Sequence, residues 1–158
     1  MSGAPAAEAQ RRLLAVRRAG ARLAAVQALY QMEQTGQSAR SVIADFMEDR
    51  LGLNDEGDPV EEADPDLFRA IVDGVVDSQE AIDGAIMNRL AKGWKIERLD
   101  ATSRAILRAA VFELMFDPGL PSQIVLDEYV SLAHAFFDGT EPKFINGLLD
   151  NVARDIRG

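Results

Sequence analysis

The sequence DATSRAILRAAVFELMF, residues 100–116, is the clearest helical segment of this 158-residue chain. Its apolar side chains recur at steps of three and four positions, which is the spacing of one buried helix face. Pro118, Gly119 and Pro121 follow the segment and interrupt the pattern. The segment therefore predicts a helix whose apolar side faces a core and includes Ile106, Leu107, Ala110, Val111 and Leu114.

The same helical spacing continues on both sides of this segment. It predicts helices over about 11–35 and 39–50, two more between Pro65 and Gly93, one over 122–137 and a last one from Lys143 onward. Asp64 followed by Pro65 is typical of a helix start, because aspartate caps the first turn and proline fits the first helical position. No stretch alternates apolar and polar residues as a strand does. The predicted class is all-α, a compact bundle of about seven helices.

Length and local composition predict how the chain is organised. One domain is expected at 158 residues. Residues 1–10 are small and polar and predict a disordered tail, so that residues 11–158 form a single helical domain. Within that domain, residues 52–64, GLNDEGDPVEEAD, combine glycine, proline and many acids, which predicts a mobile acidic loop.

Composition argues against most kinds of enzyme. The chain has no cysteine, and its one histidine, His134, lies among apolar residues of a predicted helix. Neither a phosphate-binding loop nor a dinucleotide-binding glycine motif is present. Glu113, a lone acid in the apolar segment, is expected to be an ion-pair or capping partner. We therefore expect no catalytic activity and no metal site built from cysteine or histidine. The chain also lacks an apolar run long enough to cross a membrane and a secretory signal, which predicts a cytoplasmic protein.

The charge of the chain is distributed unevenly. The net charge is −9, yet residues 1–30 hold five arginines against one glutamate, a net charge of +4. Residues 45–66 hold ten acids against a single arginine. A basic arm on an acidic body is typical of an interaction segment.

The arginines of this arm follow a helical face. Arg18 and Arg22 are four residues apart, Arg11 lies seven residues before Arg18, and Gln27 adds a polar group nearby. Guanidinium groups match two phosphate oxygens at once, so the arm predicts nucleic-acid binding. The alternative is a solvated helix end whose arginines serve solubility.

A second candidate lies at the start of the last predicted helix, Lys143-Phe144-Ile145-Asn146. A helix N-terminus favours phosphate, and Lys143 adds a positive charge. Phe144 falls outside the apolar face that begins at Ile145, so it is free to stack on a base. The alternative is that Phe144 belongs to the core. For Trp94, in the turn after Gly93, a structural role is favoured over a stacking role.

Four stretches carry a resemblance to a known family. They are ARLAAVQALYQ (21–31), ERLDATSRAILRAAVFEL (97–114), PSQIVLDEYVSLA (121–133) and KFINGLLDNV (143–152). Together they resemble the NusB (N-utilisation substance B) transcription antitermination proteins, over about residues 17–156. The resemblance implies helices in two small subbundles and no cofactor. It implies binding of boxA, a single-stranded RNA element of ribosomal RNA transcripts, together with NusE, ribosomal small-subunit protein ten. The pair acts on the elongating RNA polymerase.

The resemblance also assigns residues. The family's arginine-rich motif falls on Arg17, Arg18 and Arg22, although Ala19-Gly20-Ala21 interrupts it here. Lys143 and Phe144 match a position near the RNA. The NusE-binding face points to Arg98, Leu99 and Ser103.

Two other functions stay open beside RNA binding. One is an acidic protein-interaction module that does not bind RNA tightly alone. The other is a homodimer that stores the protein in an inactive form. The acidic loop is interpreted as a solvated linker, with electrostatic competition against RNA as the alternative.

Overall fold

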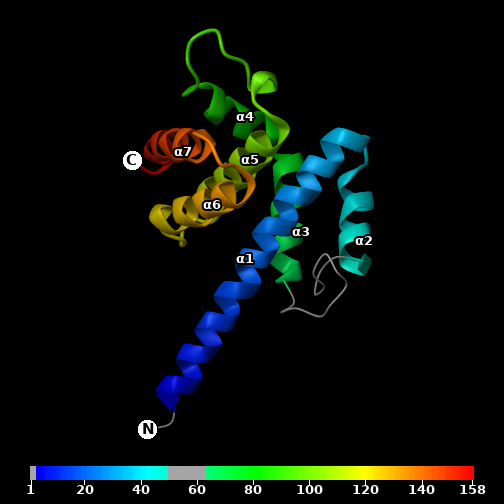
Figure 1. Ribbon diagram of the computed structural model, residues 1–158, viewed down its shortest axis with the longest axis vertical. Helices are drawn as coiled ribbons and strands as arrows, with labels where there is room; N and C mark the ends of the chain where they lie inside the picture. Colours follow the sequence, from blue (N-terminus) through cyan, green and yellow to red (C-terminus); the bar gives the residue numbers. More distant parts are fainter. Residues whose placement is uncertain (1–2, 50–62) are drawn as a thin grey trace.

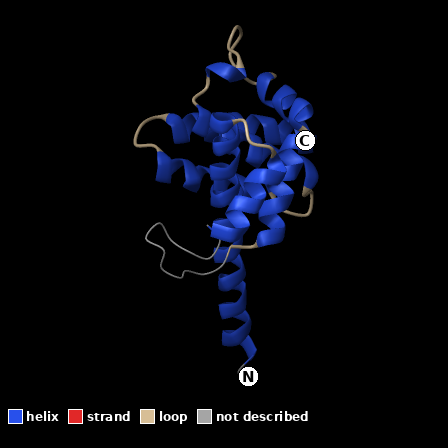
Figure 2. Ribbon diagram, turned by 90° about the vertical axis from the view of Figure 1, so that its right-hand side faces the viewer, coloured by secondary structure: helices blue, strands red, loops and turns tan. Residues whose placement is uncertain are grey.

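The computed structural model describes residues 3–49 and 63–158, and within them it contains seven α-helices, one 3-10 turn and no strand (Figures 1 and 2). The predicted all-α class is therefore confirmed. The elements are α1 (Gly3–Thr35), α2 (Ala39–Asp49), α3 (Pro65–Asp77), α4 (Gln79–Met87), the 3-10 turn η1 (Ile96–Arg98), α5 (Ala101–Phe116), α6 (Ser122–Phe136) and α7 (Glu141–Arg157).

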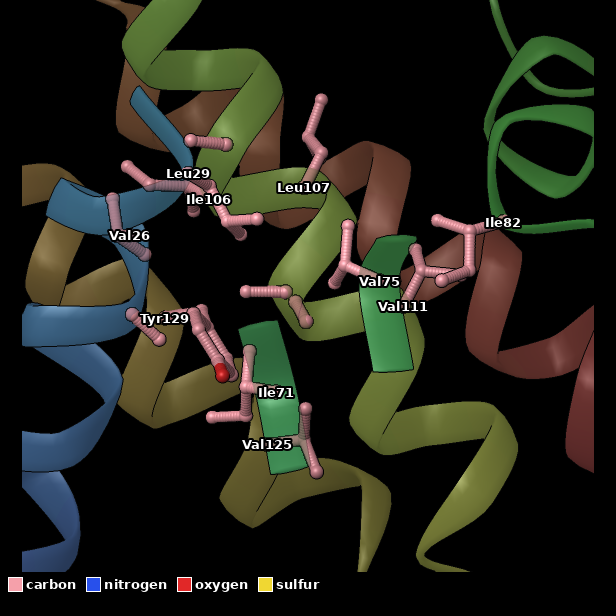
Figure 3. Packing of buried hydrophobic residues seen from close by; sticks show 14 of the residues in the cluster. Val26, Leu29, Ile71, Val75, Ile82, Ile106, Leu107, Val111, Val125 and Tyr129 are labelled. Carbon is pink, nitrogen blue, oxygen red and sulfur yellow. The ribbon is translucent and has the colours of Figure 1, made fainter. Parts of the chain in front are cut away.

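Helix α5 is the centre of the bundle. It contacts α1, α3, α4, α6 and α7, while α1, α2 and α3 pack on one another and α6 packs on α7. This gives the two small subbundles that were expected. Figure 3 shows Ile106, Leu107 and Val111 of α5 among side chains of α1, α3 and α6. All three are fully buried, and burying each such side chain contributes about 1.5–3 kcal/mol.

Helix ends follow the local sequence. The Asp64 side chain accepts hydrogen bonds from the backbone N–H of Asp66 and Leu67, as expected for the cap of α3. Gly36 ends α1 with a φ of 78°, a backbone conformation that suits glycine. Gly93, with a φ of 87°, lies in the turn beyond α4, which already ends at Met87. Ser122 is the first residue of α6, and Pro121 precedes it.

The prediction of a disordered tail over residues 1–10 is wrong for the part that the structure describes. Residues 3–10 are the first turns of α1, which projects from the body as an arm (Figures 1 and 2). Four alanines in this segment favour a helix, and Pro5 is tolerated because it lies in the first turn. The small and polar residues of this segment suggest disorder, but its alanines have a strong helix propensity.

The predicted acidic loop, residues 52–64, falls mostly outside the described residues. Its last two residues are described and lie against α1. Ala63 is buried, and the backbone N–H of Asp64 donates to the carbonyl oxygen of Arg17 at 2.9 Å. A Cβ on Gly20 would lie 3.3 Å from the Cβ of Ala63, so the glycine in α1 permits this close approach.

Three large apolar side chains on otherwise buried helix faces are partly exposed. Tyr30, Val76 and Phe136 each lie at the edge of an otherwise buried helix face. The helical period fixes the direction of a face but not its width, which depends on where neighbouring helices stop. Tyr30 and Phe136 meet at a surface groove described below.

Gly74 in α3 is expected to reject any larger residue. A Cβ there would lie 2.0 Å from Cε1 and 2.5 Å from Cζ of Phe112, whose ring also packs on Phe116. We expect Gly74→Ala to lower the free energy of unfolding in urea by about 1–3 kcal/mol. Gly84→Ala in α4 is the matched control. Nothing lies within 4 Å of its Cβ position, so that variant should gain up to about 1 kcal/mol. Equal gains in both variants would contradict the close packing at Gly74.

Candidate nucleic-acid interface

The arginine arm is the exposed first half of α1. Arg11 and Arg12 are exposed, whereas Arg17 and Arg18 are half-buried where the arm meets the body. The guanidinium of Arg12 lies 3.8 Å from the Glu8 carboxylate, one turn earlier, and both side chains are exposed. Such an exposed pair is weak, so Arg12 remains available to another anion.

Arg22 does not belong to this exposed set. It is only 3% exposed, and its guanidinium donates to Glu113 of α5 through Nε at 2.8 Å and Nη2 at 3.0 Å. The prediction that Arg22 contacts RNA is therefore wrong, and the predicted cation partner of Glu113 is confirmed. Arg22 shares a helical face with Arg18, but one turn further along α1 that face is buried against the other helices. The spacing of residues within α1 does not show where this burial begins.

The buried ion pair has a third member. The Tyr129 hydroxyl of α6 donates to the same Glu113 carboxylate. Burial and the negative charge of Glu113 together raise the pKa of Tyr129 well above its usual value, so Tyr129 stays a neutral donor. Burial opposes the charge of Arg22, but its hydrogen bond to Glu113 and their mutual attraction outweigh this and raise the pKa of Arg22. The network joins α1, α5 and α6 at the base of the arm.

Gln27 lies apart from the arginines. Nine residues, or about two and a half helical turns, place it on the opposite face of α1 from Arg18. It borders a groove of about 450 Å³ between α1, the start of α5 and the end of α6, lined by Val26, Gln27, Tyr30, Gln31, Gln34, Thr102 and Phe136. The structure therefore does not bring Gln27 and Arg18 together.

The start of α7 exposes the side chains that were predicted to meet RNA. Lys143, Phe144 and Asn146 all face solvent, whereas Ile145 is buried. Phe144 is 43% exposed, which confirms that it lies outside the core. Thr140 precedes the helix without capping it through its side chain.

Phe144 borders a second groove, of about 390 Å³, which also holds residues predicted to bind a partner. Arg98 and Leu99 line it, and so does Trp94. Trp94 is 53% exposed, so the structural role favoured for it is wrong. The single signal in the sequence was a tryptophan in a short turn between two lysines, which does not distinguish a buried ring from an exposed one.

Ser103, the third predicted partner contact, has a structural role. It is buried, and its hydroxyl donates to a carboxylate oxygen of Asp100 at 2.7 Å. Its backbone N–H donates to the other oxygen at 2.9 Å. Ser103 therefore completes the cap of α5, and although it is among the residues that line the groove, its side chain is almost fully buried there.

Arg104 holds the groove's rim, and sequence reasoning missed it. From inside α5 its Nη1 donates to the carbonyl oxygens of Ile96, Glu97 and Leu99. Its Nε donates to Glu33 of α1 at 3.0 Å, and this bond raises the pKa of Arg104. An arginine on the buried face of an apolar helix was the available signal, because such a charge requires partners.

Other kinds of site are not apparent in the described residues. No group of three or more acidic or histidine side chains there is placed to hold a metal ion. None of the described helices combines the length and the apolar character needed to cross a membrane. The exposed cations and aromatics of α1, the 91–99 segment and α7 are therefore the main candidate site.

Comparisons with known proteins agree with this picture. The model of the NusB family matches residues 19–154. The chain is 62% identical over 141 residues to the transcription antitermination protein NusB of Hyphomonas neptunium, covering 89% of this chain and 92% of that protein. It is 52% identical over 140 residues to the NusB of Caulobacter vibrioides, covering 89% and 94%.

Solved structures give the same result. The T. maritima NusB structure is 26% identical with a TM-score of 0.73, covering 89% of this chain and 93% of that one. A structure of antitermination factors NusB and NusE in complex with dsRNA is 27% identical with a TM-score of 0.74, covering 88% and 97%. The family match and these identities agree with the helical fold, the arginine arm and the residues 143–146 at the start of α7. The chain belongs to the NusB family of transcription antitermination proteins.

Proposed function

We propose that this antitermination protein binds the single-stranded boxA element of ribosomal RNA transcripts together with NusE. The observation that carries the proposal is the exposed Lys143–Phe144 pair at the start of α7, on the same molecule as the arginine arm. A related structure that holds NusB, NusE and RNA supports it. That structure contains dsRNA, whereas an exposed phenylalanine suits unstacked bases, which favours a single strand here.

The proposed contacts divide by chemistry. Arg11, Arg17, Arg18 and Lys143 neutralise phosphates, which sets affinity and its salt dependence. Phe144 stacks on a base, and the exposed amide of Asn146 hydrogen-bonds to a base edge. Arg22 and Gln27 are not part of this surface.

NusE is the proposed protein partner, and the elongating RNA polymerase is the proposed target of the pair. The net charge of −9 favours a basic partner, because opposite charges speed association. Exposed Arg98 and half-buried Leu99 remain the proposed starting point of the partner-binding face. We also propose that the chain forms one domain and acts in the cytoplasm, where ribosomal RNA is transcribed in bacteria.

A homodimeric store is the second candidate function. Leu13, Leu14 and Val16 are exposed on the arm, beside the arginines. Pairing two arms would bury these apolar side chains and cover the RNA-binding cations. Sedimentation with and without RNA tests this, because RNA should convert a dimer of this kind into monomers. A dimer that RNA leaves unchanged would count against the store.

The main test is an RNA titration with and without NusE, using boxA, a scrambled oligomer and a boxA duplex at two salt concentrations. We expect boxA to bind most tightly when NusE is present. Three or four phosphate contacts predict a slope of about −2 to −3 in log affinity against log salt. Absence of binding to every oligomer under every condition would overturn the proposal.

Arg18→Ala tests the arm directly. We expect it to weaken boxA and the scrambled oligomer by a similar factor, because phosphate contacts carry little sequence information. The salt slope should become shallower by about 0.7 for the single phosphate lost. Arg40→Ala, an exposed arginine of α2, is the matched control and should leave affinity and slope unchanged. Equal effects of the two variants would contradict a specific role for the arm.

A further inference from the structure

Two aromatic side chains from distant parts of the chain border the same groove and are both left in solvent. Trp94 comes from the turn between α4 and η1, and Phe144 comes from the first turn of α7. The ring pairs among the described residues are Phe46 with Phe68 and Phe112 with Phe116, so neither Trp94 nor Phe144 has a ring partner there. Exposed apolar surface of this kind marks an interaction site.

The lining of the groove shows which chemical group it fits. Leu90, Ala91 and Leu99 line the same groove as the two aromatic side chains and supply apolar surface there. Asp100 also lines the groove, but its carboxylate is occupied by Ser103. Glu141 lines it too and would repel a phosphate. The inside of the groove is therefore suited to a neutral planar group and poorly suited to an anion.

The surroundings of the groove have the opposite charge. Lys92 and Lys95 flank Trp94 in the sequence, Lys143 precedes Phe144, and Arg98 lines the groove itself. All four cations are exposed, on a chain whose net charge is −9. Apolar aromatic walls surrounded by cations are the arrangement that proteins use for single-stranded nucleic acid, with the base inside and the phosphates outside.

The groove is continuous with the RNA surface proposed above, because Phe144 belongs to both. We propose that Trp94 is a second base-stacking residue and that the groove between Trp94 and Phe144 holds one unstacked base of the RNA. Arg98, which lines the same groove, then lies where the RNA backbone meets the proposed partner-binding face. This inference rests on the proposed function and adds the position and the chemistry of a base-binding site.

Trp94 is the only tryptophan of the chain, so its fluorescence reports on this groove alone. The experiment titrates the full chain with boxA while following Trp94 emission and, separately, the anisotropy of labelled RNA. We expect RNA to quench Trp94 with the same midpoint that anisotropy gives. A series of oligomers with one abasic position each should lose the quenching at one position, which identifies the stacked base.

Variants test the energetic role of the ring. Trp94→Ala is expected to weaken RNA binding by about 5- to 150-fold, and Trp94→Phe by less, because the smaller ring keeps a stacking face. Phe116→Ala is the matched control. Phe116 is 54% exposed but lies at the far end of α5, so its loss should leave RNA affinity unchanged.

Three results would overturn the inference, and they differ in what they leave standing. If RNA binds by anisotropy while Trp94 emission and the affinity of Trp94→Ala are unchanged, the groove is not a base site, but the proposed function survives. If NusE alone alters Trp94 emission and RNA does not, the groove is a protein-binding site. If the unaltered chain binds no RNA with or without NusE, both proposals fail together.

Discussion

Arg22→Ala is expected to lower the free energy of unfolding by about 3–5 kcal/mol, the range for breaking a buried ion pair from one side. The Glu113 carboxylate is almost fully buried and receives two hydrogen bonds from Arg22. Without them, its charge would be held inside the protein by the Tyr129 hydroxyl alone at close range. Glu128, whose carboxylate lies 3.8 Å from Nη1 of Arg22, would lose its attraction as well.

The measurement is equilibrium unfolding in urea, with Arg18→Ala as the control. Arg18 is four residues earlier and half-buried at the surface, so its loss should change stability by less than about 0.5 kcal/mol. The triple variant Arg22→Met, Glu113→Leu and Tyr129→Phe should recover most of the loss, because apolar groups replace both charges and the Tyr129 hydroxyl that donates to Glu113 is removed with them. If that folded triple variant keeps the RNA affinity and salt slope of the unaltered chain, Arg22 is structural. A small stability loss in Arg22→Ala with an RNA defect like that of Arg18→Ala would contradict this assignment.

The architecture followed from the sequence because its evidence is local. The apolar spacing of residues 100–116 and the Asp64-Pro65 start depend on neighbouring residues only, and both were confirmed. The start of α1 was the exception. Its composition was interpreted as disorder, whereas its alanines extend the helix to Gly3.

The candidate site followed from the sequence only in part. Phe144 was identified as exposed because it departs from a helical face, which is again local information. Arg22 was misassigned because Glu113 lies 91 residues away in the sequence, and spacing within one helix cannot reveal such a partner. Trp94 was misjudged for the same reason, since its groove is formed with Phe144 from a helix beginning at Glu141.

Arg104→Ala is expected to lower the free energy of unfolding by about 2–4 kcal/mol and to disturb the Trp94 groove at the same time. Its Nη1 donates to three carbonyl oxygens of the 96–99 segment, which carries Arg98 and Leu99. Losing a charged donor there leaves the carbonyl oxygen of buried Ile96 without that partner, which costs roughly 1–3 kcal/mol. The bonds to Glu97 and Leu99 are only part-buried, so their loss adds less. The Glu33 carboxylate keeps one hydrogen-bond donor in this variant, because it also accepts from Arg108 at 3.4 Å.

The control for this variant is Arg108→Ala. Arg108 pairs with Glu33 and Asp83 but bonds none of the carbonyl oxygens that Arg104 holds, so its loss should lower stability without altering Trp94 emission. Arg104→Ala should in contrast shift that emission, speed amide exchange over 96–99 and weaken RNA binding. Arg104→Lys should fall between them, because one ammonium group cannot span Glu33 and three carbonyl oxygens together. If Arg104→Ala loses stability while emission, exchange and RNA affinity all stay unchanged, the groove keeps its shape without the arginine. The base site would then depend on packing of the 91–99 segment against α7, and Arg104 would stabilise the helical bundle without shaping the groove.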